Sequence, residues 1–129
     1  MTESTTPIRS LDFTAAKALL DGAVRDRDSR RIGLLLVHPS LILRRQAADA
    51  LGQIGGKADV PELIAALEAN QVVYGGGTEE QVLKEDLNGA LIAALQRLTG
   101  HDLGPVDPAS DAEVRRALEA ARQWRAANG

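Results

Sequence analysis

An internal repeat constrains this chain more than any other feature. Residues 11–39 align without a gap on residues 42–70, a shift of 31, and identical residues occupy four pairs of positions: Ala16 with Ala47, Leu20 with Leu51, Asp28 with Asp59, and Leu36 with Leu67. Shifts of 44 and then 51 extend the match to a third copy, and the extra residues fall around 70–81 and 100–108, where breaker residues gather. A repeat of this length predicts similar supersecondary units packed side by side.

The spacing of apolar residues within each copy is that of helices. In the second copy they recur three and four positions apart, first over 43–54 and then over 60–67, which predicts a pair of amphipathic helices. Each second helix is preceded by a candidate N-cap, and a glycine stands near the end of each first helix: the caps are Asp28, Asp59 and Ser110, and the glycines are Gly22, Gly55 and Gly100. The repeat shifts also predict buried rows of side chains: Ile32/Leu63/Val114 and Leu36/Leu67/Leu118. The fold class is therefore predicted to be all-α.

Composition supports helices and removes most catalytic chemistry. Alanine and leucine supply 39 of the 129 residues, and only Phe13, Tyr74 and Trp124 are aromatic, whereas strand-rich domains depend on β-branched and aromatic residues. The chain has no cysteine and two histidines, which excludes disulfides, thiolate ligands and cysteine nucleophiles and leaves little for a histidine metal site. We predict no catalytic, cofactor-binding or metal-binding residue, and we expect that the protein is not an enzyme.

The second copy carries the most characteristic pattern, the run RRQAADALGQIG over residues 44–55 followed by DVPELIAAL over 59–67. These segments resemble a HEAT repeat, particularly the short bacterial HEAT-like type of the phycobilisome lyases. Residues 95–100, with the closing helix that contains Trp124, resemble the terminal capping unit of bacterial HEAT proteins. The resemblance implies a short α-solenoid of three antiparallel helix pairs over residues 11–127, with units at 11–39, 42–70 and 79–127 after a flexible tail over 1–10. It also implies that the second helices line a concave face.

The resemblance implies a mode of action more than a reaction, because HEAT proteins mostly bind other proteins. We expect a non-enzymatic protein–protein interaction module, whether adaptor, regulator or inhibitor, that binds its partner through the concave face of the second helices. The family's relatives also include alkyl-DNA glycosylases and bilin-attachment lyase subunits. A nucleic-acid-binding protein and a bilin-lyase-like accessory subunit are therefore the alternatives.

Charge and hydropathy bear on the partner. The net charge is −3, so no general positive excess attracts a phosphate backbone, and nucleic acid is disfavoured. Residues 1–10 lack the apolar core of a signal peptide, and the longest apolar stretch, 32–43, is too short to span a bilayer, which predicts a soluble cytoplasmic protein with no membrane partner. Seven acids and one base in residues 59–86 predict either an ordinary solvated helix surface or an acidic stripe facing a basic partner protein.

Residues related by the repeat shifts stack in rows, and three rows lie nearer solvent than the buried ones: Arg31/Glu62/Glu113, Leu34/Ala65/Arg116 and Val37/Glu68/Glu119. These rows and the glycine-rich segment 74–78 supply the candidate partner-binding residues: Arg31, Leu34, Glu62, Glu68, Tyr74, Glu113, Arg116 and Glu119. We interpret the glycine-rich segment as a connection rather than a phosphate cradle, because two glutamates follow it.

Arg44 and Arg45 invite two interpretations. With other arginines nearby in the sequence they could bind an anion, but interleaved aspartates favour solvated ion pairs, including one between Arg45 and Asp49 on the same helix face. The resemblance to HEAT proteins implies that one of the two arginines bridges adjacent units.

Overall fold

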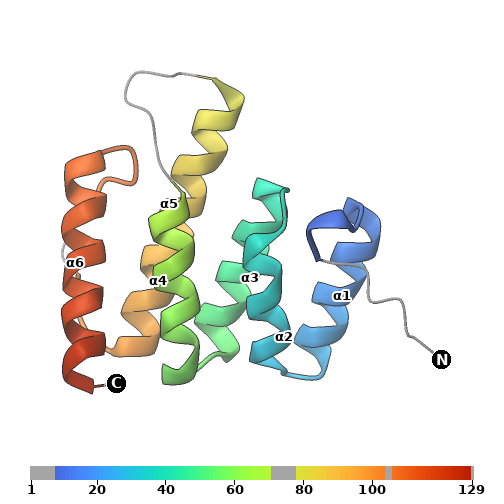
Figure 1. Cartoon of the computed structure of the whole chain (residues 1–129), viewed down its shortest axis with the longest axis horizontal. Coiled ribbons are helices and arrows are strands. Elements are labelled where there is room, and N and C mark those ends of the chain that lie inside the picture. Colours follow the sequence, from blue (N-terminus) through green and yellow to red (C-terminus); the bar gives the residue numbers. More distant parts are fainter. Residues whose placement is uncertain (1–7, 71–77, 104–105, 129) are drawn as a thin grey trace.

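Figure 1 shows α-helices standing side by side, from α1 at one end of the molecule to α6 at the other. This computed structural model describes residues 8–70, 78–103 and 106–128, and within them every regular element is helical. The described elements are η1 (Ile8–Ser10), α1 (Phe13–Arg25), α2 (Ser29–Leu34), η2 (Leu35–Val37), α3 (Leu41–Ile54), η3 (Lys57–Asp59), α4 (Val60–Ala69), α5 (Glu79–Thr99) and α6 (Asp111–Asn128), where η marks a 3-10 turn. The all-α fold class predicted from the sequence is confirmed.

The helices contact alternate helices as well as their neighbours in the chain. The most extensive contact joins α3 to α5, and α3 also contacts α1. On the second helices, α4 contacts both η2 and α6. Helices α1, α3 and α5 thus form one connected series, and η2, α4 and α6 form another.

The predicted buried rows are confirmed. Every member is at most 9% exposed: Ile32, Leu63 and Val114 in one row, and Leu36, Leu67 and Leu118 in the other. Small residues mark the close approach of α3 to α5, since a Cβ added at Gly52 would lie 3.3 Å from the Cα of Ala94. Alanine and glycine at such positions let two helices come together. At the ends of the series, Trp124 packs against the core, whereas Phe13 is 45% exposed.

Two of the three predicted N-caps are confirmed, and one is wrong. The Asp28 carboxylate accepts a hydrogen bond from Arg31 N–H at the start of α2, and the Ser110 hydroxyl accepts one from Glu113 N–H at the start of α6. Asp59 instead accepts from Gly56 N–H at 2.9 Å and makes no side-chain bond to α4. The reason is that the 3-10 turn η3 runs directly into α4, so Asp59 already has a helical backbone conformation and its carboxylate closes the preceding turn.

Glycines follow the last residues of α3 and α5. Gly55 follows α3, and Gly100 follows α5 in the left-handed conformation at φ 67°, where a side chain would be strained. Gly22 lies within the last turn of α1 rather than after it. In the described part of the chain, no helix has the length and apolar character needed to cross a membrane.

Candidate partner-binding groove

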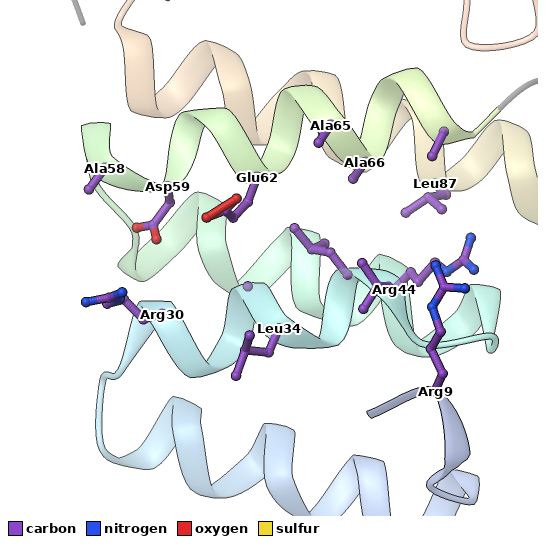
Figure 2. A pocket seen from close by; sticks show the side chains of 14 residues that line it. Arg9, Arg30, Leu34, Arg44, Ala58, Asp59, Glu62, Ala65, Ala66 and Leu87 are labelled. Atoms are coloured by element: carbon purple, nitrogen blue, oxygen red, sulfur yellow. The ribbon is translucent and has the colours of Figure 1, made fainter. Parts of the chain in front are cut away.

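A groove of about 630 Å³ has α2 and η2 on one side and α4 on the other (Figure 2). Its apolar lining combines bulky side chains with alanines: Leu34, Leu36, Val37, Ala65, Ala66, Ala69 and Leu87. Leu34 is 57% exposed and Val37 is 48% exposed. Two large apolar side chains therefore face solvent at the same hollow.

The sequence explains why this hollow forms. α2 is only six residues long and continues as the 3-10 turn η2, which ends at Val37 because Pro39 restricts His38 to extended backbone. Residues three apart align along a 3-10 turn, so Leu34 and Val37 lie on one side while the leucines between them are buried. The facing surface of α4 carries alanines at helical spacing after Glu62, and their small side chains leave the space open.

Two arginines stand at one end of the groove. Figure 2 shows the guanidinium groups of Arg9, from η1, and Arg44, from α3, next to each other. Burial lowers the pKa of Arg44, and the neighbouring positive charge of Arg9 lowers it further. None of the ion pairs found between described residues includes either arginine. This end of the groove therefore holds two adjacent cations that no carboxylate of the described chain neutralises.

His38 brings these two arginines together. Its backbone carbonyl accepts a hydrogen bond from Arg44 Nε, and its ring Nε2 lies 2.8 Å from the carbonyl oxygen of Leu11. The ring's other nitrogen accepts from Ser40 N–H, so Nε2 carries the proton and donates it to Leu11. The buried histidine thus ties the segment that follows Arg9 to the start of α3.

The opposite end of the groove has mixed charge, with Arg30 from α2 and Asp59 and Glu62 from η3 and α4. Asp59 is buried and bonded to Gly56, whereas Glu62 is exposed. A Cβ added at Gly33 would lie 3.6 Å from Glu62 Cγ, an ordinary van der Waals distance, so the side chain of Glu62 reaches across the groove toward α2. The carboxylate of Glu62 is the acidic group that a ligand in the groove would meet.

The structure divides the predicted partner-binding residues between separate places. Leu34 and Glu62 line the groove. Arg31 forms ion pairs with Asp26 and Asp28 at the turn between α1 and α2. The other described candidates belong to α4 and α6, away from the groove lining: Glu68, Glu113, Arg116 and Glu119. Tyr74 lies outside the described residues.

The candidates on α4 and α6 have contacts of their own. Arg122 of α6 forms an ion pair with Glu68 of α4 at 2.6 Å and another with Glu119 at 3.6 Å. Glu113 accepts a hydrogen bond from Asp107 N–H at 3.4 Å, and Arg116 is exposed. Glu68 and Glu119 thus belong to a contact between two helices of the protein itself.

The acid-rich segment 59–86 does not form one face of the groove. Of its seven acids, Asp59 and Glu62 line the groove, while Glu68, Glu80 and Glu85 contact Arg122, Lys84 and Gln81 respectively. The choice between a solvated surface and a stripe for a basic partner remains a prediction. Among the described residues, no three histidine, aspartate or glutamate side chains are grouped so that they could hold a metal ion.

Sequence reasoning missed the importance of Arg9 and assigned Arg44 to solvated ion pairs. The expected pair of Arg45 with Asp49 is also not among the ion pairs of the described residues. One signal pointed to Arg44: it stands near the N-terminus of α3, where the helix dipole disfavours a cation. No signal connected it to Arg9, which lies 35 positions earlier.

Comparisons of this chain with protein-family models, with curated proteins and with solved structures gave no match.

Proposed function

We propose that this protein is a short HEAT-like α-solenoid that serves as a non-enzymatic interaction module, and that it binds a segment of another protein in the groove between α2, η2 and α4. The observation that carries the proposal is that Leu34 and Val37 are exposed in the groove, opposite the alanines of α4. Exposed bulky apolar side chains are typical of protein contact sites when they gather at one hollow.

The arrangement of the helices supports the solenoid part of the proposal. First helices contact first helices and second helices contact second helices, as in a stack of helix pairs. The groove lies between second helices of successive pairs, which is the surface that the HEAT resemblance assigns to partner binding.

The lining supports a binding role over a catalytic one. In the described part of the lining, the charged groups are three arginines, which stay protonated in proteins, together with Asp59, which accepts a hydrogen bond from a backbone amide, and Glu62. Among the described residues that line the groove there is no serine, histidine or lysine that could act as a nucleophile or proton shuttle beside Glu62. Its polar groups are suited to orienting a ligand along an apolar floor.

The test uses a library of random peptides displayed against the immobilised full chain, with affinities of the enriched peptides then measured by fluorescence anisotropy. Val37→Lys places a charge at the groove and should weaken binding at least tenfold. Val82→Lys is the matched control, because Val82 is 49% exposed against 48% for Val37 but belongs to α5 outside the groove lining. Equal affinities of the two variants for every enriched peptide would contradict the proposal.

Nucleic acid is the alternative occupant, since Arg9, Arg30 and Arg44 all line the groove. Asp59 and Glu62 line the same groove and would repel a phosphate backbone, which favours a protein partner. Duplex DNA that bound the full chain with steep salt dependence, and competed with the enriched peptides, would support the alternative.

A further inference from the structure

The cationic end of the groove identifies the chemistry of the partner. Resting on the function proposed above, we propose that Arg9 and Arg44 together receive a carboxylate of the bound segment, so that the partner presents an acidic residue beside apolar side chains. The acidic group would occupy the end of the groove at η1 and the start of α3, and the apolar side chains would cover Leu34 and Val37.

No carboxylate of the described residues forms an ion pair with either of the two arginines. Arg44 is half-buried and Arg9 is beside it, yet the ion pairs of the described residues include neither. Like charges held close together repel, and partial burial weakens the solvent screening that would relieve them. A carboxylate between the two guanidinium groups would remove this repulsion.

Arg44 is held in position for such a contact. Its Nε donates to the carbonyl oxygen of His38, and no hydrogen bond from its terminal nitrogens to a described residue accompanies that bond. The guanidinium is therefore oriented by one bond while its outer N–H groups remain for a ligand. A planar guanidinium matches the two oxygens of a carboxylate, and an oriented one loses less entropy on binding.

The rest of the groove favours a peptide over other carriers of negative charge. A fatty acyl chain along the floor would lie against Glu62 and bury its charge without a partner, which is unfavourable. A polyanion would meet the same carboxylate as a like charge. A peptide can offer a backbone N–H or a basic side chain to Glu62 while its own carboxylate binds the arginines.

The dimensions fit a short segment. Glu62 and Ala69 mark the length of α4 that lines the groove, and seven helical steps of about 1.5 Å span about 10 Å. An extended peptide covers about 3.3 Å per residue, so about three residues bridge this length. The expected segment therefore has an acidic residue, then two or three positions that include apolar side chains, and then a hydrogen-bond donor. A basic group of the partner would meet Glu62 and not the arginines.

The experiment starts from the peptides enriched on the full chain. We expect most of them to carry Asp or Glu within about three residues of a large apolar side chain, the spacing that an extended chain allows. For one such peptide, replacing its acid by the amide should weaken binding tenfold, which is about 1.4 kcal/mol. The double variant Arg9→Gln with Arg44→Gln should show the same loss and should no longer distinguish acid from amide. The losses from changing the peptide's acid and from changing the two arginines should therefore not add. This result would identify the contact, because an unrelated loss of affinity would leave the preference for the acidic peptide over its amide unchanged.

Two controls separate the contact from changes in charge or folding. Arg45→Gln with Arg125→Gln removes the same charge from exposed positions outside the groove lining, and its affinity should stay within twofold of the unmodified protein. Arg9→Gln alone leaves the Arg44 bond to His38 in place, and far-UV circular dichroism checks that each variant is folded.

The possible outcomes distinguish this inference from the function on which it rests. If Val37→Lys weakens binding but the arginine variants do not, or if the enriched peptides lack acids, the groove binds a segment of another kind and the inference is wrong. If neither Val37→Lys nor the arginine variants weaken peptide binding, or if no peptide is enriched, both proposals are wrong. If dodecanoate or inorganic phosphate binds more tightly than every peptide, the inference is also wrong.

Discussion

Two consecutive glycines between α3 and α4 give the sharpest test of the packing. A Cβ added at Gly55 would lie 2.6 Å from the carbonyl oxygen of Leu51 and 3.2 Å from Leu98 Cδ1, whereas a Cβ added at Gly56 would meet nothing within 4 Å. Both glycines have negative φ angles, −69° and −142°, in regions that alanine adopts freely. Any difference between Gly55→Ala and Gly56→Ala therefore measures steric contact and not backbone strain.

The expected magnitude follows from what would have to move. Leu51 carbonyl oxygen also accepts the Gly55 N–H at 2.8 Å, so relieving the clash means displacing a backbone group that ends α3. Overpacking of this kind costs about 1–3 kcal/mol, and a weakened hydrogen bond adds about 1 kcal/mol. We expect Gly55→Ala to lower the free energy of unfolding by about 2–3 kcal/mol. Gly56→Ala should leave it unchanged or raise it by up to about 1 kcal/mol, because alanine restricts the unfolded chain.

Urea denaturation followed by far-UV circular dichroism measures the free energy of unfolding of both variants. At about 4 °C per kcal/mol for a domain of this size, the melting temperature of Gly55→Ala should fall by roughly 10 °C. Because Gly55 sets where α4 starts relative to α3, this variant should also weaken peptide binding in the groove. Equal stability of the two alanine variants would refute the reasoning, since it would mean that the turn accommodates a side chain at either position.

Three further comparisons test the described contacts. Asn88 is 1% exposed and accepts a hydrogen bond from Asn70, the residue directly after α4, so Asn88→Ala should lower the free energy of unfolding by about 2 kcal/mol. Asn128→Ala, at an exposed position, should stay within about 0.5 kcal/mol, and similar losses in urea denaturation would contradict the buried contact. Gly100 has a φ of 67°, so Gly100→Ala should lower the free energy of unfolding by about 1 kcal/mol, and Gly100→Asn should lower it by less. A lower melting temperature for Gly100→Asn than for Gly100→Ala would count against the left-handed cap. Leu91→Ala should lower the free energy of unfolding by about 2–5 kcal/mol. Leu34→Ala should lower it by under about 1 kcal/mol but should weaken peptide binding, and a large loss of stability at Leu34 would show that it is part of the core.

The repeat predicted the core well because burial follows local periodicity. Ile32, Leu63 and Val114 are spaced by the repeat shifts, and each turns inward because its helix has one apolar face. The same reasoning placed Leu34 beside solvent. It could not separate Gly55 from Gly56, because the difference depends on how the turn after α3 places each glycine against the Leu51 carbonyl and against Leu98 of α5.

The groove was only half predictable for a similar reason. Leu34 and Glu62 follow from the repeat, since they lie on second helices of adjacent units. The cationic end depends on η1, which precedes the first copy, and on the bonds of His38 to Leu11 and Arg44. The repeat does not predict this arrangement, because Arg9 precedes the first copy and the bonds of His38 have no equivalent at the matching position 69, which is an alanine.

Val37, Glu68 and Glu119 occupy equivalent positions of the repeat, but their surroundings in the structure differ. If repeat-related positions stack, the two glutamates lie close together on α4 and α6, and their like charges would repel. Arg122 forms ion pairs with both, so the carboxylates share one guanidinium. At the neighbouring step of the row, Val37 lines the groove, and η2 meets the alanines of α4 across it. The contact between α4 and α6 is therefore closed by charge within the protein, whereas the one between η2 and α4 stays open, with Arg9 and Arg44 at one end. This asymmetry is the physical reason for placing the partner at the second helices of the first two pairs rather than along the whole row.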